Sequence, residues 1–246
     1  MPSMSVILPA AGRSTRFGDK HEKKQFAMLE GRPLWLHAAE RFVNRQEVCQ
    51  TLVVIPPEDE EFFLAKFGST AALMGIEVVL GGPERCHSVE RALERVKEDV
   101  ELVCIHDAAR PCIASAWIDK VVTVAAEKGA AILAIPVAQT LKRVGEDGRI
   151  EETIPRAGVW EAQTPQVFRR DWVLEAYRKR GDFLATDDAQ LVERAGYPVY
   201  VVMGSPLNIK IATKEDLRLA EQILKILPKP ATSGPAHPFA EDQFWR

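Results

Sequence analysis

Short runs of apolar residues recur along this chain, and longer stretches with a different pattern separate them. The apolar runs lie at 5–9, 51–56, 76–80, 102–106, 130–137 and 199–203. Continuous apolar strands of this kind belong to a sheet that is covered on both faces. The stretches at 33–44, 58–67, 87–98, 115–128 and 170–180 carry apolar residues at helical spacing. The alternation predicts an α/β fold with a mostly parallel central sheet and helices on both faces.

The length of the chain allows one α/β domain or two small ones. It has 246 residues, 46% of them hydrophobic, which is enough for a sizeable core. We predict a single domain over residues 1–227 that includes a β-arm at about 138–157. Residues 228–246 are rich in proline and in small and polar residues, which predicts a flexible C-terminal tail.

Charge and cysteine content narrow the possible partners. A formal net charge of −3 produces no overall field that attracts nucleic acid or an anionic membrane. The four cysteines form no CxxC pair, the N-terminus lacks the pattern of a signal peptide, and no run approaches the ~20 apolar residues of a membrane helix. We therefore expect free thiols, a cytoplasmic location and phosphorylated small molecules as ligands, with no nucleic acid and no membrane.

A basic loop follows the first apolar run. The small residues Ala10, Ala11 and Gly12 let backbone N–H groups approach an anion. The cations after them can neutralise several phosphate charges: Arg13, Arg16, Lys20, Lys23 and Lys24. This pattern predicts a nucleoside triphosphate site, and the alternative is a basic surface loop.

Spacing excludes two familiar phosphate-binding loops at this position. Five residues separate Gly12 from Gly18 and Asp19 follows, which does not match a Walker loop. Ser14 occupies the place of the second glycine in the dinucleotide fingerprint, so a nicotinamide-dependent oxidoreductase is disfavoured.

Two further segments lie just after predicted strands, where ligands bind in parallel sheets. In GGPERCHS, Gly81 and Gly82 allow backbone amides to face a base or ribose, and Ser88 is positioned to begin a helix; an ordinary turn with a helix cap is the alternative. In HDAARP, Asp107 is suited to Mg²⁺ or a ribose hydroxyl and Arg110 to a phosphate; a surface ion pair is the alternative.

The segment 139–156 breaks the strand–helix alternation. Alternating residues flank Glu146-Asp147-Gly148, which predicts a β-hairpin that leaves the sheet. Because an isolated two-stranded ribbon is marginal in water, we expect it to pack on a partner subunit. A solvated charged hairpin is the alternative.

Three polar residues near the end of the chain have both a structural and a functional interpretation. Thr186 is a candidate N-cap of the helix at 185–196. Lys210 lies between two isoleucines in a predicted short strand, so it faces either the site or solvent at a sheet edge. Thr213, with Asp216 three residues later, resembles a capping box for a last helix at 214–226.

Several motifs in this order resemble one enzyme family. They are PAAGRSTR…KKQ, GGPERCHS, HDAARP, QTLKR, Arg156, AQTPQ, ATDD and NIKIAT. Together they are similar to the 2-C-methyl-D-erythritol 4-phosphate cytidylyltransferases of the non-mevalonate isoprenoid pathway, over roughly residues 5 to 225. The resemblance implies a Rossmann-like nucleotidyltransferase fold, a homodimer with interlocking arms, and Mg²⁺ as the divalent cation. It also implies transfer of CMP from CTP to methylerythritol phosphate, with release of pyrophosphate.

The resemblance assigns roles to matching residues. Arg16 and Lys24 would stabilise the pentacoordinate α-phosphate and the leaving group, while Arg156 and Lys210 would position the attacking phosphate. No metal ligand is certain, because CTP phosphates would hold most of the Mg²⁺ shell and Asp107 is only a candidate. The CTP site would be lined by Ala10, Ala11, Gly12, Gly81, Gly82 and Ser88, and the sugar-phosphate pocket by Asp107, Arg110, Thr140, Thr164 and Thr186, with Thr140 and Arg156 reaching in from the neighbouring subunit.

Three positions depart from the family pattern. Ser14 replaces a glycine, Lys23 replaces the proline before the family's lysine, and Pro83 stands where an acidic residue is common. Two other functions remain open at this stage. One is a cytidylyltransferase for another polyol phosphate, such as ribitol 5-phosphate, and the other is a non-catalytic nucleotide-binding subunit.

Overall fold

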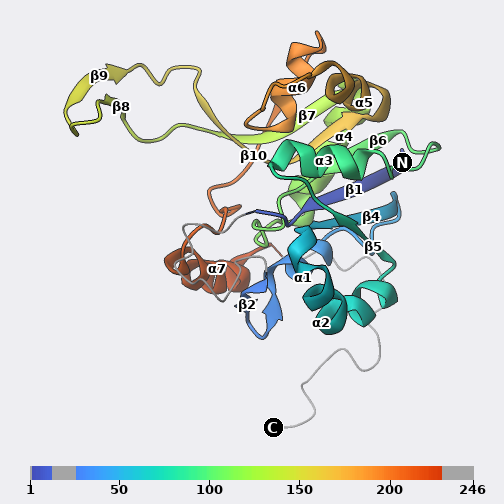
Figure 1. The fold of residues 1–246 in the computed structure, drawn as a ribbon. Coiled ribbons are helices and arrows are strands. Elements are labelled where there is room, and N and C mark those ends of the chain that lie inside the picture. Colours follow the sequence, from blue (N-terminus) through green and yellow to red (C-terminus); the bar gives the residue numbers. More distant parts are fainter. Residues whose placement is uncertain (1, 13–25, 229–246) are drawn as a thin grey trace.

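A seven-stranded sheet forms the centre of the computed structural model, which describes residues 2–12 and 26–228 (Figure 1). The spatial order of its strands is β11-β7-β10-β6-β1-β4-β5. Only β10 runs antiparallel to its neighbours. The predicted mostly parallel sheet is therefore confirmed. Its strands are β1 (Met4–Pro9), β4 (Val48–Ile55), β5 (Ile76–Leu80), β6 (Leu102–Ile105), β7 (Ala130–Pro136), β10 (Trp160–Arg169) and β11 (Tyr200–Met203).

Helices cover both faces of this sheet, because successive side chains of its central strands point to opposite sides and most of them are apolar. In β1, Val6 and Leu8 belong to one core cluster and Ile7 to the other. The first cluster is completed by α1 (Leu34–Ala39), α2 (Glu60–Leu73) and α4 (Ser115–Lys128). The second is completed by α3 (Arg85–Leu93), α5 (Arg170–Lys179) and α6 (Asp188–Arg194).

The last helix, α7 (Lys214–Ile226), packs outside these two layers. It begins at the predicted capping box, in which Thr213 and Asp216 exchange side-chain to backbone hydrogen bonds. Its apolar side contacts a third cluster that includes Leu29 and Ile211. The small hairpin β2 (Met28–Leu29) and β3 (Arg32–Pro33) lies against it, and a short 3₁₀ helix, η2 (Pro57–Asp59), precedes α2.

The predicted arm is present as a separate two-stranded hairpin. Strands β8 (Leu141–Val144) and β9 (Ile150–Ile154) pair antiparallel and project away from the sheet (Figure 1). The turn uses Gly148 with a φ of 83°, a backbone conformation that favours glycine. Arg143 and Glu152 form an ion pair across the two strands, 2.6 Å apart.

Three sequence predictions about secondary structure are wrong. Lys210 lies in an irregular segment rather than a strand: among the described residues, the N–H of Ile211 bonds to the carbonyl of Ala109 but no ladder of strand hydrogen bonds follows. Ser88 does not begin a helix, since α3 starts one turn earlier with Glu84 at the N-cap. Thr186 is not the N-cap of α6; Asp187 is, and its carboxylate accepts the N–H of Gln190.

Over residues 2–12 and 26–228, no helix is long and apolar enough to cross a membrane. The predicted catalytic residues Arg16 and Lys24, the departures Ser14 and Lys23, and nearly all of the predicted tail lie outside the described residues.

Candidate active site

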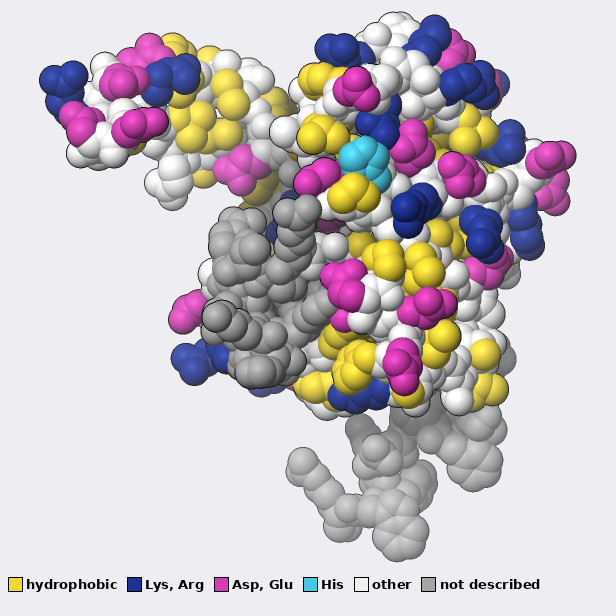
Figure 2. Space-filling model, in the orientation of Figure 1, with side chains coloured by type: hydrophobic (Ala, Val, Ile, Leu, Met, Phe, Trp, Pro, Cys, Tyr) yellow, Lys and Arg dark blue, Asp and Glu magenta, His cyan; other side chains and the backbone are white. Residues whose placement is uncertain are grey.

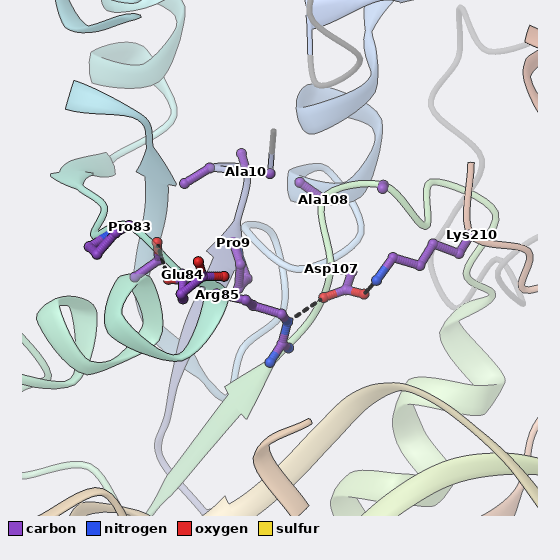
Figure 3. A pocket seen from close by; sticks show the side chains of 12 residues that line it. Pro9, Ala10, Pro83, Glu84, Arg85, Asp107, Ala108 and Lys210 are labelled. Atoms are coloured by element: carbon purple, nitrogen blue, oxygen red, sulfur yellow. Dashed lines mark hydrogen bonds and ion pairs between the residues drawn. The ribbon is translucent and has the colours of Figure 1, made fainter. Parts of the chain in front are cut away.

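A pocket of about 310 Å³ opens at the carboxyl ends of β1 and β6, where a parallel sheet presents its ligand-binding loops (Figure 3). One side is formed by the small residues Ala10, Ala11 and Gly12 that follow β1. Figure 3 shows Asp107 and Lys210 at one end of the pocket and Pro83 and Glu84 at the other, with Ala10 between them. The small residues leave backbone groups accessible to a ligand, and the charged residues supply electrostatic recognition.

The glycine pair after β5 is required by close packing. A Cβ atom on Gly81 would lie 2.7 Å from the Ser88 hydroxyl and 2.8 Å from the Cβ of Ala11, and one on Gly82 would lie 2.5 Å from the Cβ of His87. The N–H of Gly82 donates to the Ser88 hydroxyl over 3.1 Å. Ser88 lines the main pocket, whereas the two glycines line an adjoining hollow that shares Ala11 and Pro83 with it.

A smaller chamber of about 100 Å³ lies on the other side of Asp107. It is lined by three other predicted substrate residues, Arg110, Thr164 and Thr186. Thr164 reaches it because β10 runs antiparallel to β6, which places Thr164 beside Asp107, whose N–H donates to the Thr164 hydroxyl over 3.0 Å. Both chambers share the side chains of Arg85, Asp107 and Lys210.

Alternating charges connect the two chambers to the protein interior. The Asp107 carboxylate lies between two cations, with Oδ1 3.2 Å from Nε of Arg85 and Oδ2 2.7 Å from Nζ of Lys210 (Figure 3). Arg85 also pairs with the fully buried Asp188 over 2.7 Å, and Asp188 accepts a 2.6 Å hydrogen bond from the Tyr177 hydroxyl. Each buried charge therefore has an opposite charge in contact, which limits the cost of removing it from water.

These contacts set the protonation states in the site. Burial raises the pKa of Asp107, but the charges of Arg85 and Lys210 outweigh it and hold that pKa well below its usual range. Burial lowers the pKa of Arg85, but Asp188 and Asp107 outweigh it and the net shift is well upward. Burial lowers the pKa of Arg110, whose Nε is buried and finds no hydrogen-bond acceptor among the described residues. A donor in that position suits an anionic ligand.

His106 does not line the smaller chamber but contacts two residues that do, Arg110 and Thr164. Its imidazole is fully buried, and its Nε2 lies 2.9 Å from the carbonyl of Arg110. Its Nδ1 lies 3.1 Å from the Thr164 hydroxyl. Burial lowers the pKa of His106 to about 4, so the ring is neutral at physiological pH.

The low pKa of His106 predicts acid sensitivity. A histidine with an ordinary pKa near 6.5 in the unfolded chain binds its proton first, so this contribution to stability is complete above pH ~6.5 and is lost as the pH falls towards about 4. The loss should reach about 3 kcal/mol and be measurable by urea unfolding at several pH values.

The matched control for this prediction is His106→Gln, which does not titrate. The pKa of His37 is also lowered by burial and acts in the same direction, so the difference between the two curves isolates His106. Parallel curves for the two proteins between pH 6.5 and 4.5 would contradict the prediction.

Some predicted site residues do not meet in this chain. Thr140 and Arg156 are exposed at the base of the arm, and neither lines either chamber. Arg156 donates to the carbonyl of Ala138 within the same arm. Predicted residues that do converge on the two chambers and the adjoining hollow are Ala10, Ala11, Gly12, Gly81, Gly82, Ser88, Asp107, Arg110, Thr164, Thr186 and Lys210.

Sequence reasoning missed Arg85, the residue that contacts both chambers from α3. The motif GGPERCHS contains it, but only the glycines and Ser88 were interpreted. Asp188 is a second residue that the sequence analysis leaves without a role, although it is fully buried and pairs with Arg85. An acidic residue at a helix start carries no signal that its partner lies 103 positions away.

The described residues offer no ready metal centre. No group of three or more His, Cys, Asp or Glu side chains within residues 2–12 and 26–228 is arranged to hold an ion. Both carboxylate oxygens of Asp107 are engaged by cations, so Asp107 would have to exchange one of them to bind a metal.

The sheet is mostly parallel, and a pocket that contains the cations Arg85 and Lys210 lies at the carboxyl ends of its strands. This arrangement is typical of nucleotide-binding α/β proteins. Residues 4–226 match the family model of 2-C-methyl-D-erythritol 4-phosphate cytidylyltransferase. The chain belongs to this family, as the sequence motifs predicted, and is therefore an enzyme of the cytidylyltransferase class.

Individual members of the family are similar to this chain over most of their length. The chain is 46% identical over 233 residues to the 2-C-methyl-D-erythritol 4-phosphate cytidylyltransferase of Rhodopirellula baltica, covering 90% of this chain and 95% of that protein. It is 42% identical over 224 residues to that of Alkaliphilus metalliredigens, covering 90% and 92%. The crystal structure of the Thermus thermophilus enzyme superposes with a TM-score of 0.73 at 32% identity, covering 92% of this chain and all of that one.

Proposed function

We propose that this enzyme transfers CMP from CTP to 2-C-methyl-D-erythritol 4-phosphate, releasing pyrophosphate and forming 4-diphosphocytidyl-2-C-methyl-D-erythritol. The observation that carries the proposal is the pair of adjoining chambers that share Arg85, Asp107 and Lys210, in a chain that matches the family over residues 4–226. One chamber suits a nucleotide and the other a small phosphorylated polyol. A transfer reaction needs its two substrates to meet at such a junction.

CTP occupies the larger chamber in this proposal. Its base and ribose lie against the small residues after β1 and near Ser88, where the glycine pair allows close backbone approach. Pro83 lines this chamber, where family members commonly carry an acidic residue, so a base or ribose contact is supplied differently here or is absent. The α-phosphate then points towards Asp107 and Lys210.

The polyol phosphate occupies the smaller chamber. Arg110 supplies positive charge, and the hydroxyls of Thr164 and Thr186 supply hydrogen bonds to the polyol. Lys210 is only partly buried, with 44% of its side chain exposed, so its ammonium can exchange Asp107 for a substrate phosphate.

The chemistry requires charge neutralisation and alignment rather than a general base, because the nucleophile is already an anionic phosphate oxygen. Its attack on the α-phosphorus of CTP forms one P–O bond and breaks the bond to the β-phosphate, which leaves as pyrophosphate. In the proposal Arg16 and Lys24 stabilise the charge that develops on the α-phosphate and the leaving group. Lys210 and Arg156 hold the attacking phosphate in line.

Mg²⁺ is the proposed divalent cation. Mg²⁺ prefers oxygen ligands and commonly takes several of them from nucleotide phosphates and water, which fits a site where no group of three or more ligating side chains is found among residues 2–12 and 26–228. When bound it would neutralise phosphate charge.

The proposed function is tested by pyrophosphate release from CTP in the presence of Mg²⁺. Methylerythritol phosphate and ribitol 5-phosphate are supplied side by side, with EDTA as the control for the metal. Release from CTP that occurs with methylerythritol phosphate but not with ribitol 5-phosphate supports the proposal. Release mainly with ribitol 5-phosphate assigns the same chemistry to another polyol phosphate. CTP binding without release for either substrate would identify a non-catalytic nucleotide-binding subunit.

We further propose that the arm pairs two chains into a homodimer and completes each site from the neighbouring subunit. Large apolar side chains on and near the arm are exposed, including Val144 at 51%, Ile150 at 57% and Trp160 at 40%. Figure 2 shows hydrophobic and charged side chains together on the projecting arm. An exposed ribbon of this composition suits a partner surface. Thr140 and Arg156 at its base would then supply the contacts that are absent from both chambers of their own chain.

The arm proposal predicts complementation between two inactive variants. Arg156→Ala and Lys210→Met are each expected to be nearly inactive alone. Mixed and allowed to exchange subunits at equal concentrations, they should recover about a quarter of wild-type activity, because half of the dimers carry one intact site. Light scattering must show a dimer, and absence of recovery in a confirmed mixed dimer would place Arg156 in the site of its own chain.

A further inference from the structure

We propose that His106 is a positioning residue for the polyol-phosphate chamber, acting through Thr164 and Arg110. The inference rests on the proposed function and adds a residue that does not line either chamber. His106 follows directly after β6, at the point where the strand ends and the loop to α4 begins. Its imidazole contacts two of the segments that supply side chains to the smaller chamber, β10 and the loop after β6.

The hydrogen bonds of the imidazole admit one arrangement of protons. The carbonyl of Arg110 can only accept, so Nε2 carries the proton and donates to it over 2.9 Å. In the neutral ring Nδ1 is then an acceptor, and the Thr164 hydroxyl donates to it over 3.1 Å. The Thr164 oxygen in turn accepts the N–H of Asp107 over 3.0 Å. Every polar group in this chain of bonds is satisfied.

These hydrogen bonds link residues that lie in two separate segments of the chain. Thr164 belongs to β10, whereas Asp107 and Arg110 belong to the loop after β6. The loop closes a turn from the N–H of Arg110 to the carbonyl of Asp107, and further backbone bonds join Ala108 to Pro9 and Ala109 to Ile211, but none of these backbone bonds joins it to β10. The His106 ring packs against Phe42, with 5.2 Å between ring centroids, and is fully buried. The buried ring therefore links Thr164 to Arg110. A second link runs through Asn208, whose side-chain amide donates to the Thr164 carbonyl over 2.8 Å and whose backbone carbonyl accepts from Arg110 over 2.7 Å.

The consequence is selective for one substrate. The small residues after β1 and Ser88, which face the nucleotide in the proposed function, make no contact with this ring among the described hydrogen bonds. Removing the hydrogen bonds from His106 to Thr164 and Arg110 should therefore weaken binding of the polyol phosphate and leave CTP binding unchanged. A general loss of structure would weaken both.

Two near-isosteric substitutions remove the two hydrogen bonds of the His106 ring one at a time. His106→Asn keeps a polar group near the position of Nδ1 and so keeps the contact with Thr164, while His106→Gln reaches the position of Nε2 and keeps the contact with Arg110. His106→Phe keeps the packing on Phe42 and loses both contacts. Because each lost hydrogen bond leaves a buried partner unsatisfied, we expect KM for the polyol phosphate to rise about tenfold in His106→Asn and His106→Gln, and about a hundredfold in His106→Phe.

Steady-state pyrophosphate release, with each substrate varied in turn, tests the inference. The expected result is a raised KM for the polyol phosphate and a KM for CTP within about twofold of wild type. The rise should be smaller in His106→Asn and His106→Gln than in His106→Phe. Combining His106→Gln with Thr164→Val should add little to either single change, because both remove the same bond. If His106→Phe fails to fold, the KM values of His106→Asn and His106→Gln still test the inference.

Three results would overturn the inference alone: an unchanged KM for the polyol phosphate, an equal rise in both KM values, or additive effects of His106→Gln and Thr164→Val. A folded wild-type protein that releases no pyrophosphate with any polyol phosphate would overturn the proposed function and this inference with it. The two failures are therefore distinguishable by the activity of the wild type.

Discussion

Replacing Lys210 by methionine should lower the rate of pyrophosphate release about a hundred- to a thousandfold, the range typical for removal of a preorganised charge donor. Lys210 contributes its ammonium to the junction of the two chambers, 2.7 Å from Oδ2 of Asp107. Methionine keeps most of the side-chain volume and removes the charge. Single-turnover and steady-state measurements with CTP and methylerythritol phosphate would show whether the loss lies in the chemical step or in binding.

Folding is not expected to change in this variant, because Asp107 retains Arg85 as a partner and Lys210 is 44% exposed. The matched control is Lys210→Arg, which retains the charge and should keep a larger share of activity. Near-wild-type turnover in a folded Lys210→Met protein would remove Lys210 from the mechanism. An equally inactive Lys210→Arg would show that the geometry of the ammonium, and not only its charge, is required.

Replacing Asp188 by alanine should lower the free energy of unfolding by about 3 kcal/mol, because it leaves Arg85 without its buried partner. Asp188 is fully buried, and it accepts hydrogen bonds from Tyr177 and pairs with Arg85. The value lies at the low end for a broken buried pair, since Arg85 is 28% exposed and keeps Asp107. Chemical denaturation monitored by tryptophan fluorescence measures it.

The matched control for this substitution is Tyr177→Phe, which removes only the neutral hydrogen bond and should cost about 1 kcal/mol. If Asp188→Ala costs no more than Tyr177→Phe, the ion pair with Arg85 contributes nothing net to stability. Activity measured on the folded fraction would show separately whether Arg85, once released from Asp188, still holds Asp107.

Much of the architecture could be predicted from local sequence patterns. The apolar runs correspond to β1, β4, β5, β6, β7 and β11, and the helices α4 and α7 have the predicted bounds. These features are local, because the period of apolar residues and the capping residues lie within the element itself. The hairpin of the arm was also predictable, since its turn residues and alternating strands are contiguous.

Errors occurred where long-range contacts override local pattern. Ile209 and Ile211 flank Lys210 as in a strand, yet within the part of the chain that the structure describes no neighbouring strand pairs with them and the segment is irregular. Asp187 rather than Thr186 caps α6, where Asp187 and Asp188 also meet Gln166 from β10. A propensity for capping cannot choose between adjacent candidates without knowledge of what packs against them.

By itself the sequence determined the α/β class, the strand-end loops, the arm and the family. These features depend on the spacing of nearby residues and on the order of motifs, which can be read without the fold. Only the tertiary structure decided that Arg85 joins the two chambers, that His106 ties Thr164 to Arg110, and that Asp188 lies buried behind them. These relations join residues tens of positions apart, and folding brings them together when strands pair and helices close over the sheet. Their energies depend on burial and on opposite charges in contact, which exist only once water has been excluded.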